Sequence, residues 1–148
     1  SERTKQFESD IGETAENKIP AICKAMQNSA SKSKPFTLNI ANTGIFGSRY
    51  DPKVIWFGIN NNEVLQNLAE NIFAELEAVD YARDRQNFVP HLTIGRIKEV
   101  NDKSLFQQII SKYNTIDIQQ EHVGEIVLYE SILDRKGPTY VKIFSAQL

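Results

Sequence analysis

The chain has 148 residues, enough to bury one hydrophobic core, and its 41% hydrophobic and 24% charged residues are typical of a single globular domain. Its 17 Lys and Arg against 19 Asp and Glu give a net charge of -2, which argues against tracking along a nucleic acid but permits a local phosphate site. No apolar run approaches the roughly 18 residues of a membrane span and no signal peptide begins the chain, so we expect a cytoplasmic protein. The lone Cys23 has no disulfide or metal-ligand partner, so we expect no metal or cofactor.

The first predicted element is a helix over about residues 15–30, with Thr14 as its N-cap. Pro20 is tolerated only in a first turn, which allows the helix to start a few residues later. One face of the helix carries a buried stripe of small and aliphatic side chains, namely Ile19, Ile22, Cys23 and Met26. The polar run 28–35 predicts the end of the helix and a loop.

Two strands and a long helix are predicted next. Residues 36–40 alternate as a strand, and an irregular connection with two glycines and the pair Arg49 and Tyr50 follows. Residues 53–59 are apolar almost throughout, which predicts a central strand covered on both faces. Residues 63–79 form the strongest amphipathic helix, whose apolar side is made of Val64, Leu65, Leu68, Ile72 and Leu76.

The C-terminal part predicts one short helix and three strands. Asp102 can cap a helix over about residues 103–112, with Leu105, Phe106, Ile109 and Ile110 directed inward. Residues 115–118 form a short strand, and residues 125–131 and 139–144 form a hairpin closed by a turn through residues 135–138. Helices and strands interleave without a strict strand-helix-strand rhythm, so the expected class is α+β, an antiparallel or mixed sheet with helices on one side.

The stretch Phe88-Val89-Pro90-His91-Leu92-Thr93-Ile94-Gly95-Arg96-Ile97 carries the clearest chemistry. As a strand it directs His91 and Thr93 to one face, and Leu92 and Ile94 to the other, which we expect to pack in a core. An imidazole and a hydroxyl side by side on a rigid strand can transfer a proton and hydrogen-bond a phosphate oxygen. The pattern H-x-T alone is weak, and a polar strand face without a function is the alternative interpretation.

The string from Phe88 to Arg96 resembles the second H-x-T motif, with its trailing Arg, of the RNA 2',3'-cyclic phosphodiesterase family, also called 2'-5' RNA ligases, within the 2H phosphoesterases. Upstream, the family's strand, loop and strand resemble Pro35-Phe36-Thr37-Leu38, Gly44-Ile45-Phe46 and Val54-Ile55-Trp56. Downstream, its closing hairpin resembles Val127-Leu128-Tyr129-Glu130-Ser131 and Gly137-Pro138-Thr139-Tyr140. The resemblance runs in the right order from about residue 12 to the C-terminus.

The resemblance implies a pseudo-symmetric 2H fold with antiparallel or mixed sheets, helices on the outside, and two H-x-T motifs facing each other across a central cleft. It implies that His91 and Thr93 are catalytic and that Arg96 binds substrate. We assign His91 as the base and a second histidine as the acid, roles that the reverse ligation would exchange. Strand alternation puts Arg96 on the Leu92 side unless Gly95 marks a bulge, so a structural salt bridge is the alternative role of Arg96.

The activity implied by the resemblance is metal-independent hydrolysis of 2',3'-cyclic phosphate RNA ends to a 2'-phosphate, with 2'-5' RNA ligation as the reverse reaction. Two imidazoles suit this chemistry, because an unperturbed histidine titrates at about pH 6.5. Small cyclic nucleotides are alternative partners, no cofactor or membrane partner is implied, and we expect a monomer. Arg49, Tyr50 and Phe88 are candidates to line an RNA-terminus cleft, with packing or loop surface as their alternative role.

The family's first H-x-T motif is missing from this sequence. His122 precedes Val123-Gly124 and does not match it, so we expect an exposed residue, and Pro35 stands where a motif His would precede Thr37. Residues 1–7, 8–11 and 12–14 resemble family segments that should lie far apart. We therefore expect residues 1–148 to form a single domain that apparently lacks N-terminal segments, including the first motif, because this sequence omits parts of the natural protein. An intact mass of 16.8 kDa, which is that of the 148 residues alone, would contradict this omission.

Two other function classes stay open. If the first motif is truly lost, the chain is a non-catalytic nucleotide or RNA-end binding domain that retains one half-site. A structural α+β domain without any ligand is the third interpretation, and it leaves the polar face of His91 and Thr93 unexplained.

Overall fold

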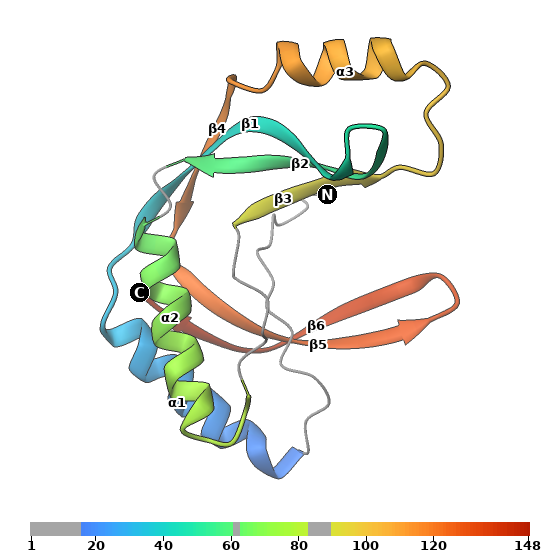
Figure 1. Cartoon of the computed structure of the whole chain (residues 1–148). Coiled ribbons are helices and arrows are strands. Elements are labelled where there is room, and N and C mark those ends of the chain that lie inside the picture. Colours follow the sequence, from blue (N-terminus) through green and yellow to red (C-terminus); the bar gives the residue numbers. More distant parts are fainter. Residues whose placement is uncertain (1–15, 61–62, 83–89) are drawn as a thin grey trace. The chain divides into compact units, whose positions relative to one another are not determined.

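The computed structural model describes residues 16–60, 63–82 and 90–148, so Thr14, Phe88 and the segments compared at residues 1–14 lie outside the described residues. The described residues divide into two compact units: residues 37–60, 63 and 90–121 belong to the first, and residues 16–36, 64–82 and 122–148 to the second. Each unit contains both helix and strand (Figure 1), which confirms the predicted α+β class. Among the described residues, no helix is long and apolar enough to cross a membrane.

The first unit is built on a four-stranded sheet in the order β3-β2-β1-β4. Its strands are β1 (Phe36–Ser48), β2 (Asp51–Asn60), β3 (His91–Arg96) and β4 (Asp117–Val123). β2 pairs antiparallel with β1 on one side and with β3 on the other, so the predicted central position of this apolar strand is confirmed. The strand expected at residues 115–118 begins later and extends further, as β4.

β1 is much longer than predicted, because the glycine-containing segment that we expected to be an irregular connection continues the strand. The pairing of β1 with β2 shifts register between Ala41 and Thr43, and again between Phe46 and Gly47. Asn42 and Gly47 have positive φ angles of 68° and 100° at these two irregularities. Glycine and asparagine are depleted in regular strands but are suited to bulges. The composition of this segment therefore predicts the end of a strand, whereas the strand bends at the bulges and continues.

The helix of the first unit, α3 (Lys103–Lys112), has the predicted bounds. The side chain of Asp102 accepts a hydrogen bond from the backbone N–H of Leu105 at 2.9 Å, which confirms the predicted N-cap. Phe106 and Ile110 are half-buried, but Leu105 and Ile109 remain 51% and 47% exposed. The prediction that all four face inward is wrong for these two residues, because the helix contacts the sheet along a narrower stripe than four positions.

The second unit consists of two helices and a hairpin. A short 3-10 helix (Glu16–Lys18) leads into α1 (Ile19–Ser31), so Pro20 lies in the first turn, where it needs no intrahelical hydrogen bond. α2 spans Glu63–Glu77, two residues less than predicted. β5 (Glu125–Asp134) and β6 (Gly137–Gln147) pair antiparallel across a two-residue turn, at which Gly137 has a φ of 111°. The predicted hairpin is confirmed, with both strands longer than expected.

The core of the second unit forms where α1, α2 and the hairpin meet. Ile22, Ala25, Met26 and Ala30 of α1 pack with Leu76 of α2 and Ala146 of β6, and Ile126, Leu128 and Phe144 cover this cluster from the hairpin. Cys23 was predicted to be a small core residue on the buried stripe, but it is only half-buried and lies outside the core cluster. Burial of this apolar stripe stabilises two helices that would be marginal alone.

An ion pair links the end of α1 to α2. Lys32 Nζ lies 3.1 Å from Glu75 Oε1, and Asn28 Nδ2 donates to Glu75 Oε2 at 3.5 Å. The hydrogen bond from Lys32, followed by the one from Asn28, lowers the pKa of the Glu75 carboxyl. Because the folded pKa lies below the unfolded one, the stabilisation is present above the unfolded pKa and is lost as the pH falls through the folded pKa.

We expect an NMR titration of the Glu75 carboxyl carbon to give a lower midpoint in the wild-type protein than in the Lys32→Met variant. The methionine keeps the aliphatic stem of Lys32 and removes only the donor that the carboxylate accepts from. Equal midpoints in the two proteins would show that the pair does not form in solution.

Candidate functional site

β3 contains one more residue than the part of β2 that it pairs with. Ile55 and Trp56 are consecutive in β2 and pair with Gly95 and Thr93, so Ile94 has no partner across the ladder. Such a bulge changes the direction of the side chains that follow it by one position. Ile94 is 50% exposed at the bulge, so the prediction that it packs in the core is wrong.

The bulge brings the three predicted site residues of β3 to one face of the sheet. His91, Thr93 and Arg96 pair with alternate residues of β2, namely Gly58, Trp56 and Val54. Directly paired residues of antiparallel strands share a face, so all three side chains lie on the same side. We call this side, defined by His91, Thr93 and Arg96, the histidine face. The bulge therefore places Arg96 on the face of His91 and Thr93, whereas alternation alone would put it on the opposite face.

The three residues of the histidine face differ in exposure. His91 is half-buried, whereas Thr93 and Arg96 are exposed. Within the described residues no carboxylate forms an ion pair with Arg96, so the structural salt bridge considered as its alternative role is not observed there. An imidazole, a hydroxyl and a guanidinium in this arrangement suit a phosphate group: the first can transfer a proton, and the others can hydrogen-bond its oxygens.

Two aromatic side chains lie next to His91 on the histidine face. The ring centroids of Phe46 and His91 are 4.9 Å apart with an interplanar angle of 84°. The Phe46 ring is also 5.5 Å from the Trp56 ring, at 40°. We call Phe46 and Trp56 the aromatic floor. The sequence does not single out Phe46 as a site residue, because the strand predicted at residues 36–40 ends before it, whereas β1 continues to Ser48.

Gly44 makes room for the aromatic floor. It pairs with Trp56, and a Cβ atom at Gly44 would lie 2.2 Å from Cζ2 of the indole. The indole therefore lies directly on the backbone of β1. Its Nε1 is buried without a hydrogen-bond partner among the described residues, so packing on Gly44 rather than a hydrogen bond fixes the position of the ring.

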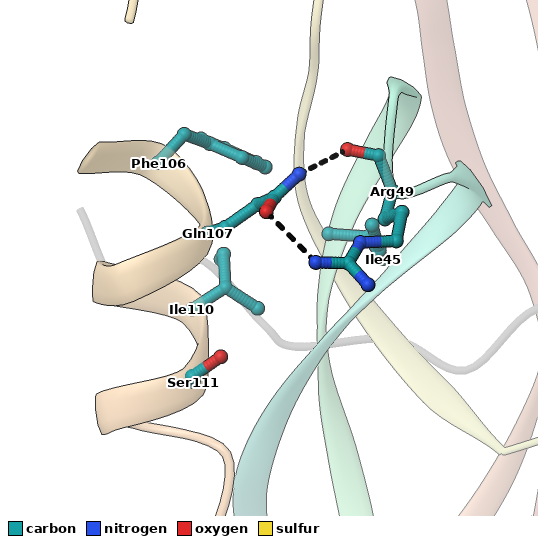
Figure 2. A pocket seen from close by; sticks show the side chains of 6 residues that line it. All are labelled: Ile45, Arg49, Phe106, Gln107, Ile110 and Ser111. Carbon is teal, nitrogen blue, oxygen red and sulfur yellow. Dashed lines mark hydrogen bonds between the residues drawn. The ribbon is translucent and has the colours of Figure 1, made fainter. Parts of the chain in front are cut away.

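The opposite side of the sheet carries α3. Ile45 of β1 lies on that side, and together with α3 it lines a pocket of about 290 Å³ whose lining residues are Ile45, Arg49, Phe106, Gln107, Ile110 and Ser111 (Figure 2). The Thr43 hydroxyl donates to the carbonyl of Ile110 at 3.3 Å, which adds a polar contact between β1 and the helix.

Arg49 and Gln107 form two hydrogen bonds with each other at this pocket. Arg49 Nη2 donates to Gln107 Oε1 at 3.2 Å, and Gln107 Nε2 donates to the Arg49 carbonyl at 2.9 Å (Figure 2). Tyr50 is 67% exposed, with the Arg49 guanidinium 5.5 Å from its ring. These hydrogen bonds connect Arg49 to α3 rather than to His91. The pocket therefore lies where α3 packs on the hairpin of β1 and β2.

The second histidine of the chain is in β4 and not in β3. His122 is exposed near the end of β4, as predicted, and it belongs to the second unit, whereas His91 belongs to the first. The predicted cleft residue Phe88 lies outside the described residues. His91, Thr93 and Arg96 are thus the predicted site residues that the described structure brings together.

The sequence of the chain is similar to those of known proteins and to one family model. Residues 9–134 match the family model of the 2'-5' RNA ligase superfamily. The chain is 32% identical over 136 residues to the RNA 2',3'-cyclic phosphodiesterase of Aquifex aeolicus (strain VF5), covering 90% of this chain and 71% of that protein. It is 31% identical over 130 residues to the protein of the same name from Archaeoglobus fulgidus, covering 88% and 71% of the two chains.

Comparison with solved structures supports the fold. The crystal structure of TT0787 of Thermus thermophilus superposes with a TM-score of 0.72 at 24% identity, covering 93% of this chain and 74% of that one. The agreement over nearly the whole chain shows that the two proteins share one fold.

Proposed function

The chain belongs to the 2'-5' RNA ligase superfamily, and from this premise we propose that it hydrolyses 2',3'-cyclic phosphates at RNA ends to 2'-phosphates. Relatives named RNA 2',3'-cyclic phosphodiesterase, at 31–32% identity over most of the chain, support the reaction class. 2'-5' ligation of RNA, in which a 5'-hydroxyl replaces water as the nucleophile that opens the cyclic phosphate, is part of the same proposal.

The observation that carries the proposal is the position of three side chains on one face of the sheet. The bulge at Ile94 aligns His91, Thr93 and Arg96, which are the residues that resemble the family's motif. A cyclic phosphate needs a proton acceptor for the attacking water and donors for its non-bridging oxygens, and the histidine face has one of the first kind and two of the second.

In the proposed mechanism His91 takes a proton from the attacking water. The water oxygen forms a bond to phosphorus while the bond from phosphorus to the ribose 3' oxygen breaks. An acid protonates that oxygen, which leaves a 3'-hydroxyl and a 2'-phosphate. The hydroxyl of Thr93 and the guanidinium of Arg96 hydrogen-bond the non-bridging oxygens as negative charge increases on them. In this scheme imidazoles carry both proton transfers, and Thr93 and Arg96 stabilise the charge that develops as the phosphorus–oxygen bonds form and break, so the proposed reaction needs no metal.

The acid in this proposal is a second histidine that the 148-residue sequence does not contain. His122 is exposed in the second unit, and its sequence does not match the H-x-T pattern. We propose that the missing histidine belongs to a first H-x-T motif of the natural protein.

The test is hydrolysis of an oligoribonucleotide that ends in a 2',3'-cyclic phosphate, by the full-length natural protein in EDTA. The expected product is a 2'-phosphate end, identified by its resistance to a 3'-specific phosphatase. No turnover with EDTA but turnover with added metal would contradict metal independence. Binding of the RNA end without turnover under any condition would instead support the half-site binding domain.

Replacement of Arg96 by alanine is expected to weaken substrate binding. A hydrogen bond to a charged group is worth about 1.5–3 kcal/mol, so we expect KM to rise about tenfold or more in Arg96→Ala. Arg96→Lys keeps the charge but loses the planar arrangement of guanidinium donors, so its KM should lie between those of the wild-type protein and Arg96→Ala. The matched control is Arg135→Ala, which removes an exposed arginine from the turn of the β5–β6 hairpin. An equal rise in KM for both alanine variants would show that only net charge matters.

A further inference from the structure

The aromatic floor next to His91 is not part of the H-x-T motif. Phe46 comes from β1 and His91 from β3, and β2 lies between these strands. Phe46 therefore reaches across a neighbouring strand to contact the imidazole, at a ring-centroid distance of 4.9 Å. A contact that spans three strands cannot follow from the local sequence around either residue.

Two glycines leave the space that this contact needs. The β2 residue paired with His91 is Gly58, which has no side chain to fill the space over β2 beside the imidazole. A Cβ atom at Gly58 would lie 3.4 Å from the Trp56 ring and 3.0 Å from the Ala41 carbonyl. Gly44 in turn lets Trp56 lie flat against β1, where its ring contacts Phe46.

The rings of Phe46 and His91 are nearly perpendicular, and the energy of such a contact depends on this orientation. A perpendicular arrangement of aromatic rings, here at 84°, is a favoured geometry, because the positive edge of one ring meets the negative face of the other. An imidazole on a strand can rotate about both of its side-chain torsions, and the terminal torsion has a broad, shallow profile. A ring packed perpendicular to the imidazole restricts that rotation.

We propose that Phe46 is a positioning residue for His91, which holds the imidazole in the orientation that faces the substrate phosphate. The inference rests on the proposed function, in which His91 transfers a proton. Proton transfer requires the imidazole nitrogen to lie within hydrogen-bond reach of the reacting oxygen, and a misplacement of about 1 Å can cost on the order of a hundredfold in rate. Phe46 thus acts on the chemical step through His91 and not through contact with the RNA.

The kinetic test uses the full-length protein with Phe46→Leu and Phe46→Tyr. Leucine retains an apolar side chain but no ring, so kcat is expected to fall about tenfold or more while KM changes less than about twofold. Tyrosine restores the ring and is expected to restore most of kcat. The matched control is Tyr140→Leu, because Tyr140 has similar exposure, 42% against 38% for Phe46, and also forms a perpendicular ring pair, with Tyr129 at 6.3 Å. Its kinetics should remain those of the wild type.

A second readout needs no activity. In the wild-type protein we expect NOEs between the ring protons of Phe46 and His91. In Phe46→Leu we expect the His91 ring protons to change chemical shift, as the ring current of Phe46 is lost. Phe46→Tyr should preserve both signals, and Tyr140→Leu should leave the His91 signals unchanged.

The outcomes separate this inference from the proposed function. An unchanged kcat in Phe46→Leu overturns the positioning role. If KM rises while kcat stays constant, the positioning role is overturned as well, and Phe46 would instead contact the RNA. If Phe46→Leu does not fold, absence of the Phe46–His91 NOEs in the wild-type protein overturns it equally. If the wild-type protein shows no hydrolysis while the NOEs are present, the proposed function fails and the ring contact stands.

Discussion

His91→Ala is expected to reduce the hydrolysis of a 2',3'-cyclic phosphate RNA end by about a hundredfold or more. Loss of a general acid or base typically costs about 10²–10⁴ in rate, and in the proposed mechanism alanine leaves nothing on the histidine face to take the proton from water. Thr93 and Arg96 remain in place, so the variant should still bind the RNA end. The measurements are kcat in EDTA and, in parallel, the anisotropy of a labelled RNA with a cyclic phosphate end.

His122→Ala is the matched control for this variant. It removes the chain's other histidine, which is exposed in β4 and belongs to the second unit, so both activity and binding should match the wild type. Equal activity of His91→Ala and the wild-type protein would contradict the proposed role of His91. Equal loss in both variants would show that the effect is not specific to the histidine face.

Gly44→Ala is expected to lower the free energy of unfolding by about 1–3 kcal/mol, the usual cost of overfilling a packed site. The added Cβ would lie 2.2 Å from Cζ2 and 2.3 Å from Cη2 of Trp56, closer than any real contact, so the indole must move off β1. Because Trp56 contacts Phe46, and Phe46 contacts His91, the displacement should also reduce kcat. Denaturant unfolding followed by Trp56 fluorescence, the chain's single tryptophan, measures the stability change directly.

Two further variants test the physical reason for this loss. Gly124→Ala is the control, because a Cβ there would be 3.6 Å from the His122 ring, an ordinary contact, and its stability should change little. In a Trp56→Phe background the smaller ring leaves room for the new methyl group, so Gly44→Ala should cost less than in the wild type. Because this background has no tryptophan, unfolding in both backgrounds is compared by circular dichroism. An equal cost in both backgrounds would show that the clash with the indole is not the cause.

Much of the fold follows from local sequence patterns. Apolar residues at helical spacing predicted α2, and an Asp followed by an amphipathic stretch predicted the cap and bounds of α3. Apolar continuity predicted that β2 is an inner strand, and a glycine-containing turn predicted the β5–β6 hairpin. These signals work because helix period, capping and turn conformation depend on residues that are close in the chain.

The errors in the strands have one common cause, which is that strand pairing is not local. β1 was expected to end near residue 40, because Gly44 and Gly47 disfavour a regular strand. Pairing with β2 nevertheless continues through two register shifts to Ser48. The extra length places Phe46 in the sheet, and no pattern within β1 alone indicates that its ring meets His91.

The sequence by itself determined which residues carry the proposed chemistry: one H-x-T motif with a trailing arginine, in the order of elements that its family shares. Only the tertiary structure decided which of those side chains lie on one face of the sheet. Alternation along β3 would have put Arg96 on the face away from His91, and the bulge at Ile94, visible only in the pairing with β2, returns it to the histidine face. The physical reason is that the face of a strand residue is fixed by the register with its neighbour, which residues far apart in the sequence set together.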